Sequence, residues 1–85
     1  MNISRAEQRV LHVLAQGGYV RHERDANGRI LEVICFTRDG HVLADCTLEV
    51  FAKLRQKRLI ASRASSPYRI SDLGRRSVRS QLDNR

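Results

Sequence analysis

The sequence predicts a small α+β domain, because helical and strand-like patterns alternate along its 85 residues. Apolar residues recur at helical spacing in residues 4–16, again from about residue 47, and after residue 71. Between these segments, β-branched and aromatic residues dominate, and glycine-containing turns separate the runs. The chain is long enough for one domain of ordinary size, so we expect a single domain over residues 1–85.

The first predicted helix covers residues 4–16. Ser4 and Glu7 match the S-x-x-E capping box, in which each side chain can bond the backbone N–H of the other residue. The consecutive glycines at 17 and 18 end the helix, because glycine adopts the left-handed conformation at low cost. The apolar stripe of this helix comprises Ile3, Ala6, Val10 and Leu14, widened by Leu11 and Val13.

A β region follows the first helix. Residues 19–23 form a candidate strand, and Asn27-Gly28 in the next turn is typical of a tight hairpin. Residues 30–37 form the clearest strand, since five of the eight are β-branched or aromatic. Residues 41–44 fit either a short strand or the approach to the next helix.

The second half of the chain predicts a helix, a small hairpin and a last helix. The second helix begins near Thr47, with Asp45 or Thr47 as its N-cap. Residues 59–61 and 68–70 read as two short strands joined by a polar loop. Together with the preceding segments, this order of helix, β-hairpin region, helix, small wing hairpin and helix is typical of a winged-helix-like fold.

Ser71 is the expected cap of the last helix, which we predict to run to about Leu82. Gly74 weakens that helix by ~1 kcal/mol relative to alanine. We therefore expect Gly74 to lie close to another stretch of backbone. The inward-facing residues of this helix are predicted to be Leu73, Val78 and Leu82.

The net charge of +7 is concentrated at one end of the chain. Residues 1–52 carry six Lys/Arg against seven Asp/Glu, whereas residues 53–85 carry ten Lys/Arg against two Asp. Such a distribution attracts a polyanion or an acidic protein surface, although it also suits a face that only keeps the protein soluble. The candidate binding residues are Lys53, Arg55, Lys57, Arg58, Arg63, Arg75, Arg76 and Arg79.

Two uses of this basic set remain open. In a winged helix the middle helix can enter the major groove of DNA while the wing contacts phosphates. A helix-turn-helix, however, needs a support helix directly before the recognition helix, and a β segment occupies that place here. The set therefore fits DNA or an acidic protein surface.

Catalytic, metal and membrane functions find little support. Cys35, His41 and Cys46 lack the short paired spacings of zinc ligands, so we expect both cysteines to be core residues. Neither the three histidines nor the turn aspartates form a recognisable catalytic motif, so we expect no enzyme activity and no cofactor. No apolar run approaches ~20 residues, and two cysteines fit reduced thiols, so we expect a cytoplasmic protein.

Several segments together resemble the YjhX toxin family. They are SRAEQRVLHVLAQGG at 4–18, DANGR at 25–29, DCTLEVFAKL at 45–54, PYRI at 67–70 and QLDNR at 81–85. The resemblance runs essentially from end to end.

This resemblance implies a bacterial toxin of a toxin–antitoxin pair, with a fold similar to the winged helix. It implies that the protein binds DNA topoisomerase I and blocks its engagement with DNA, and that the antitoxin resembles an acetyltransferase. It assigns no individual contact residue. The alternative reading of the same residues is a winged-helix transcriptional regulator that binds DNA.

Overall fold

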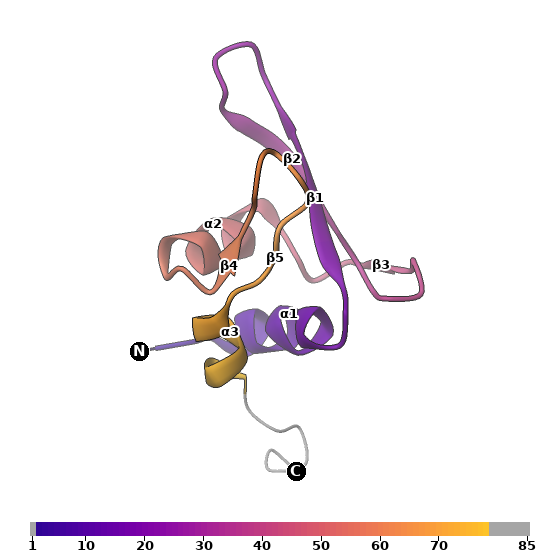
Figure 1. Ribbon diagram of the computed structural model, residues 1–85, viewed down its shortest axis with the longest axis vertical. Helices are drawn as coiled ribbons and strands as arrows, with labels where there is room; N and C mark the ends of the chain where they lie inside the picture. The colour runs from indigo at the N-terminus through magenta and orange to yellow at the C-terminus, as the bar shows by residue number, and fades with distance from the viewer. Residues whose placement is uncertain (1, 79–85) are drawn as a thin grey trace.

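The structure, a computed structural model, describes residues 2–78. Figure 1 shows the helices gathered at one end and the β1–β2 hairpin projecting from them. The predicted α+β class and the predicted order of the elements are confirmed. The elements are α1 (Arg5–Ala15), β1 (Tyr19–Arg24), β2 (Ile30–Phe36), β3 (Val42–Leu43), α2 (Leu48–Gln56), β4 (Ile60–Ala61), β5 (Arg69–Ile70) and α3 (Asp72–Ser77).

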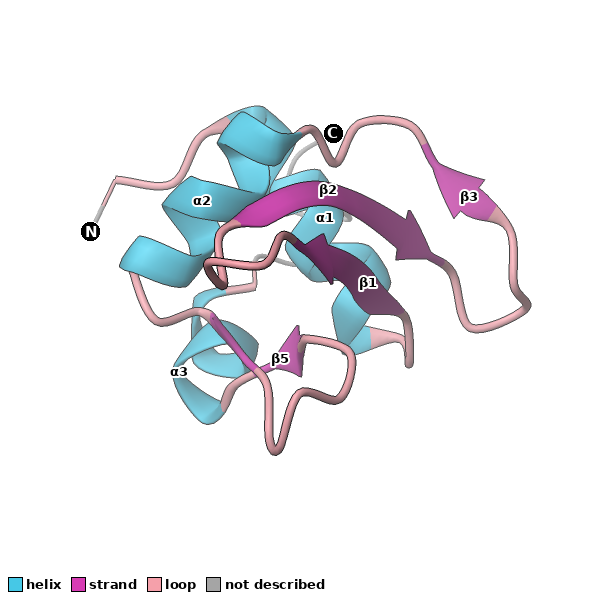
Figure 2. Cartoon of the chain, turned by 90° about the horizontal axis from the view of Figure 1, so that it is seen from above, coloured by secondary structure: helices cyan, strands magenta, loops and turns pink. Residues whose placement is uncertain are grey.

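The strands form two small antiparallel sheets that meet at one bridge. The larger sheet has the order β1-β2-β3, and β4 pairs with β5 in the smaller one. The backbones of Val20 in β1 and Tyr68 beside β5 exchange hydrogen bonds of 2.9 and 2.8 Å. The second sheet therefore extends the first along the edge of β1, as the view from above shows (Figure 2). The segment 41–44, left open by the sequence, contributes β3.

Side-chain caps fix where the helices begin. The Ser4 hydroxyl accepts a hydrogen bond from the Glu7 N–H at 3.1 Å, which is one half of the predicted capping box. Of the two candidate caps for α2, the structure selects Thr47, whose Oγ1 accepts from the Val50 N–H at 3.2 Å. The Ser71 hydroxyl caps α3 in the same way, accepting from Gly74 at 3.0 Å.

The last helix is shorter than predicted. It ends at Ser77, and Val78 is extended with φ −71° and ψ 127°. The Ser77 carbonyl accepts instead from the Gln8 side chain at 3.0 Å, and the Ser77 hydroxyl donates to the Leu73 carbonyl at 2.8 Å. Side chains thus supply partners to the end of the helix, and a valine, which favours extended backbone, follows it. Leu82 lies outside the described residues.

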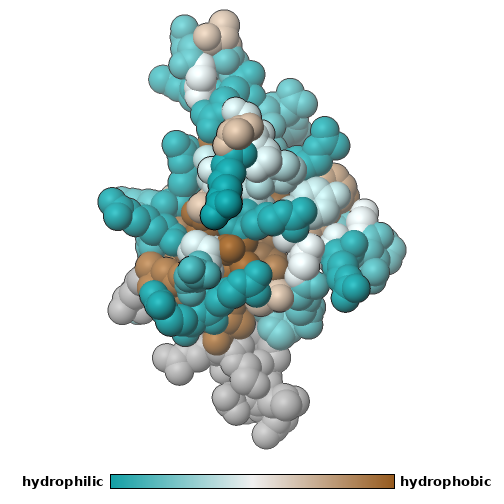
Figure 3. Space-filling view, viewed as in Figure 1, coloured by the Kyte–Doolittle hydropathy of each residue, from teal (hydrophilic) through white to brown (hydrophobic). Residues whose placement is uncertain are grey.

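The core lies between the helices and the inner face of the larger sheet. Its centre is Phe51, whose ring meets the Tyr68 ring edge-on at 4.9 Å between centroids. Leu73 and Val78 pack against this core, as predicted. Hydrophilic side chains cover most of the projecting hairpin, while apolar atoms gather over the body (Figure 3). The buried apolar residues are Val10, Leu11, Leu14, Val20, Cys35, Cys46, Phe51, Leu54, Leu59, Ile60, Tyr68 and Ile70.

The predicted close approach at Gly74 is confirmed. A Cβ atom on Gly74 would lie 2.2 Å from the Leu59 carbonyl oxygen and 2.7 Å from a methylene carbon of Ile70. The Ser71 N–H donates to that same Leu59 carbonyl at 3.0 Å, which ties the start of α3 to the end of the α2–β4 connection. Within residues 2–78, no helix is long and apolar enough to cross a membrane.

Candidate functional site

The structure divides the predicted basic set between a buried contact and several exposed positions. Arg79 lies outside the described residues. Among the seven others, Lys57 is the one whose side chain turns inward and pairs with a carboxylate. The remaining six are exposed and form no ion pair with another residue of the described chain. These six, called the basic surface below, are Lys53, Arg55, Arg58, Arg63, Arg75 and Arg76.

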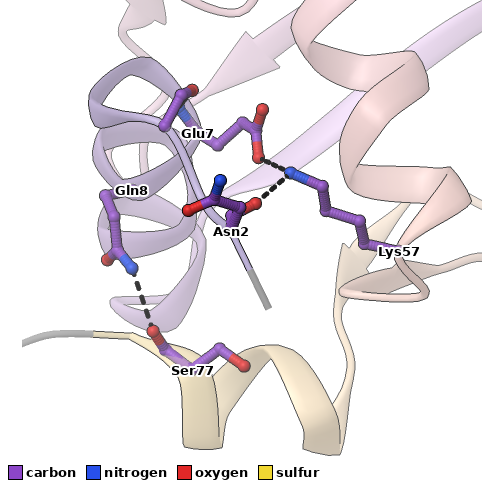
Figure 4. A network of polar contacts seen from close by, with 6 residues as sticks. Asn2, Glu7, Gln8, Lys57 and Ser77 are labelled. Carbon is purple, nitrogen blue, oxygen red and sulfur yellow. Dashed lines mark hydrogen bonds and ion pairs between the residues drawn. The ribbon is translucent and has the colours of Figure 1, made fainter.

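Lys57 links α2 to α1 rather than facing solvent. Its ammonium group lies 2.6 Å from a carboxylate oxygen of Glu7 and 2.5 Å from the Asn2 carbonyl oxygen (Figure 4). The Glu7 side chain is 3% exposed and that of Lys57 is 25% exposed. Burial alone would raise the pKa of Glu7, but the hydrogen bond and charge of Lys57, with smaller contributions from Ser4, leave that pKa below its usual value.

The exposed residues of α2 point in different directions. Lys53 lines a shallow groove with Asn2 and Ile3, on the side of α2 that faces the start of α1. Arg55 lies on the side near β1, where its charge acts on His22. Lys53 and Arg55 therefore lie on different sides of α2, and the basic surface does not form one flat patch.

Arg58 occupies a strained position at the end of α2. Its φ angle is +61°, a conformation normally taken by glycine after a helix. The Arg58 N–H donates to the Arg55 carbonyl and the Leu59 N–H donates to the Leu54 carbonyl, both at 3.0 Å, which closes the helix. The Arg58 carbonyl accepts from the Ser71 hydroxyl at 2.7 Å. This contact brings the end of α2 next to the start of α3. Arg75 and Arg76 lie in the last turn of α3.

The β4–β5 hairpin carries Arg63 at a tight turn. The Ser66 N–H donates to the Arg63 carbonyl at 2.9 Å, and Ala64 and Ser65 between them have φ angles of +50° and +66°. Such angles are typical of the two-residue turns that best match hairpin twist. The turn holds Arg63 at the exposed end of β4–β5.

His22 is a half-buried group that the sequence did not single out. Its ring meets the Tyr68 ring edge-on at 5.0 Å, and its Nδ1 atom has no hydrogen-bond partner in the described chain. Burial, followed by the charges of Arg24 and Arg55, lowers the pKa of His22 below its ordinary value of 6.5. The neutral ring is thus favoured in the folded protein.

We expect His22 to make stability fall on mild acidification. The pKa of His22 is lower in the folded protein than in the unfolded chain, so the unfolded chain binds the proton at a higher pH. Stability is therefore lost as pH falls from about 6.5 towards the folded pKa. Glu7, whose pKa is also lowered, reduces stability only at a lower pH, as pH falls below about 4.5. Urea unfolding at pH 7.0 and 5.5 measures the first loss. A His22→Phe variant that lost as much stability over this interval as the parent would contradict the assignment.

Cys35 and Cys46 are core residues, as predicted. They are 1% and 6% exposed, and both are free thiols. A hydrogen bond with the Cys46 thiol, together with burial, raises the pKa of Cys35. Within residues 2–78, no group of three or more His, Cys, Asp or Glu side chains could hold a metal ion.

Two exposed arginines of the strands, Arg21 and Arg69, were absent from the predicted set. The Arg69 guanidinium carbon lies 5.4 Å from the centroid of the Tyr19 ring. Arg21 is exposed on β1, opposite Ile34. Strand alternation could have identified Arg69, because it stands between Tyr68 and Ile70, which are both buried.

Comparison with known proteins agrees with the resemblance seen in the sequence. A family described as "Putative toxin of bacterial toxin-antitoxin pair", YjhX toxin, matches residues 1–85. The chain belongs to the YjhX toxin family. This membership implies an antitoxin partner.

Similar chains occur in several bacteria. A UPF0386 protein of Beijerinckia indica is 86% identical over 85 residues, covering all of both chains. UPF0386 proteins of Ruegeria sp. and Aliivibrio fischeri are 66% and 48% identical, also over the full length of both chains. No solved structure matches the chain. These three UPF0386 proteins thus share the length of this chain and much of its sequence.

Proposed function

We propose that this protein is a non-enzymatic toxin that binds DNA topoisomerase I in the bacterial cytoplasm and blocks its engagement with DNA. The observation that supports this most is the basic surface: six exposed cationic side chains without an ion-pair partner in the described chain, in a member of the YjhX toxin family. We further assign the fold to the winged-helix class and the antitoxin to acetyltransferase-like proteins, which is what the family resemblance implies.

Charge decides how such a protein could act. A basic surface has the wrong sign to imitate DNA. It can instead cover an acidic patch on the enzyme, or hold the enzyme and a DNA strand together unproductively. Charges at the rim of an interface mainly speed association and make it sensitive to salt. The proposed interface should therefore weaken markedly between low and physiological ionic strength.

Titration calorimetry of the nuclease-treated protein against topoisomerase I, without DNA, tests the proposal. We expect saturable binding and, in a separate relaxation assay, inhibition over the same concentration range. Absence of binding by a preparation that binds duplex DNA would overturn the proposal. It would favour the winged-helix regulator, whose DNA affinity should fall steeply with salt and prefer one operator sequence.

Reversing two charges of the basic surface should weaken this binding by roughly tenfold or more, because it replaces attraction with repulsion. We choose Lys53→Glu/Arg75→Glu and leave Lys57 unchanged, since its ion pair with Glu7 makes any substitution structural. Arg5→Glu/Arg29→Glu is the matched control, because both residues are exposed and the net charge changes equally. Equal affinities of the two variants for topoisomerase I would show that the basic surface is not the interface.

A further inference from the structure

The outer face of the larger sheet carries an aromatic row that the proposed function does not use. Phe36 lies opposite Tyr19 across β1 and β2, and Val42 of β3 lies opposite Phe36. The Tyr19 and Phe36 rings stack with 5.4 Å between centroids and 27° between planes. Arg69 continues the row, because its guanidinium group lies over the Tyr19 ring. The row thus runs across the strands as Val42, Phe36, Tyr19 and Arg69.

This row faces away from the core. Side chains alternate between the faces of a strand, and Val20 and Cys35, the neighbours of Tyr19 and Phe36, are 0% and 1% exposed. By contrast, Tyr19 and Phe36 are only half-buried, although they are large aromatic residues. Val42 is 63% exposed at the end of the row. Of the described hydrophobic residues, Ile34, Phe36 and Val42 are not among those that pack against the core.

Charge and apolar surface occur together around the row. The next pair along the same face joins exposed Arg21 of β1 to Ile34 of β2, which is 38% exposed. Arginine therefore stands both at the end of the row and beside it. The acidic residues of this face, Glu23 and Glu32, pair with each other further towards the hairpin tip.

We infer that this outer sheet face, defined by Tyr19, Ile34, Phe36, Val42, Arg21 and Arg69, binds single-stranded nucleic acid. Unpaired bases stack on aromatic rings and on arginine guanidinium planes, and nearby arginines contact the phosphates. The Tyr19 ring is already stacked against Phe36 and against the Arg69 guanidinium group. Bases can therefore stack on the two ends of the row, which are the guanidinium plane of Arg69 and the side of Phe36 next to Val42.

The character of this face favours a single strand over two other occupants. A second copy of the chain would bring Arg21 and Arg69 towards positive charge, in a protein of net charge +7. A duplex keeps its bases stacked internally, so it could use the arginines but not the rings. A single strand uses both. The inference goes beyond the proposed function, because it concerns a different face and can hold without topoisomerase I.

Fluorescence anisotropy with a labelled 15-residue oligothymidylate, against a mixed-sequence duplex of equal length, tests this inference with the protein alone. We expect binding of the single strand to be at least tenfold tighter than that of the duplex. The chain has no Trp and only two Tyr, and Tyr68 is buried, so emission from Tyr19 should be quenched on binding. Failure of topoisomerase I binding would leave these results unchanged.

Substitutions at Tyr19, Phe36 and Arg69 distinguish the contribution of base stacking to binding from that of charge. Phe36→Leu should weaken single-strand binding roughly 5- to 100-fold, the effect of losing one stacked base. Tyr19→Leu should weaken it as well, because it removes the ring against which Phe36 and the Arg69 guanidinium group are held. Arg69→Lys should weaken binding without changing its salt dependence, whereas Arg69→Gln should also reduce the slope of log affinity against log salt by about 0.7. Leu48→Ala, which changes an exposed apolar residue on α2, is the matched control.

Equal affinity for the single strand and the duplex would overturn the inference, as would parental affinity in Tyr19→Leu and Phe36→Leu. Because Arg69 is exposed, its variants still test the inference where substitution of a half-buried aromatic residue unfolds the protein. Loss of toxicity in these variants without any binding of the single strand would instead assign the face to a protein partner, and would equally overturn it.

Discussion

Replacing Lys57 by methionine is expected to lower the free energy of unfolding at neutral pH by roughly 3–5 kcal/mol, which is the usual effect of leaving one member of a buried ion pair unpaired. The substitution keeps most of the side-chain volume but removes the only cation within 4.0 Å of Glu7 among the described residues. A domain of this size has a total stability of about 5–10 kcal/mol, so the variant should be close to unfolding at 37 °C. Urea unfolding monitored by circular dichroism measures the loss.

The contribution of Glu7 to the pH dependence of stability should have the opposite sign in the Lys57→Met variant and in the parent. In the parent the pKa of Glu7 is lowered, so its contribution to stability is present above about pH 4.5 and is lost as pH falls through the folded value. Without Lys57, burial raises that pKa, and stability is instead recovered as pH falls and Glu7 becomes protonated. A structural loss unrelated to charge would not reverse the sign.

The double variant Glu7→Gln/Lys57→Met is the matched control. Removing both charges avoids a buried unpaired carboxylate, so this variant should be more stable than Lys57→Met alone at neutral pH. If the double variant were the less stable of the two, or if Lys57→Met cost less than about 1 kcal/mol, the ion pair would contribute little to the fold.

The ion pair between Lys57 and Glu7 is also the part of the basic set that the sequence could not predict. The spacing of Lys53 and Lys57 indicates correctly that they lie on one side of α2, but spacing within a helix does not reveal which segment packs there. That segment is the start of α1, about fifty positions earlier in the chain, with Glu7 already assigned to the capping box. A contact between residues this far apart depends on tertiary packing, which local patterns do not contain.

Local patterns succeeded where the determining interaction is itself local. Ser4, Thr47 and Ser71 cap helices because their hydroxyls reach an N–H three residues ahead, which a sequence motif records directly. The sequence predicted that α3 runs to about Leu82, but the helix ends at Ser77, where the Gln8 side chain of α1 donates a hydrogen bond to the Ser77 carbonyl. The outer sheet row was missed because it needs the register of three strands, and only the alternation around Arg69 was visible in the sequence.

Gly74→Ala should destabilise the protein by about 2 kcal/mol, although alanine is the better helix former. Two effects of opposite sign compete at this position. Helix propensity favours alanine by about 1 kcal/mol. The added methyl group, however, would lie 2.2 Å from the Leu59 carbonyl oxygen, and relieving such an overlap costs about 3 kcal/mol. Packing therefore outweighs propensity.

The overlap is costly because neither side can yield easily. The Leu59 carbonyl is backbone, and it already accepts the Ser71 N–H at 3.0 Å. Moving α3 away would stretch that bond and the bond from the Ser71 hydroxyl to the Arg58 carbonyl, while uncovering the fully buried Leu59. The same substitution thus loosens the contact that holds the start of α3 beside the end of α2.

Gly28→Ala provides the comparison. Nothing lies within 4 Å of a Cβ atom at Gly28, so its φ of +83° is the main cost there, about 1 kcal/mol. Thermal unfolding of both variants should rank Gly74→Ala as the less stable. If Gly74→Ala instead matched or exceeded the parent, the close packing of α3 against the Leu59 carbonyl would be wrong, and with it the placement of the basic residues of α3.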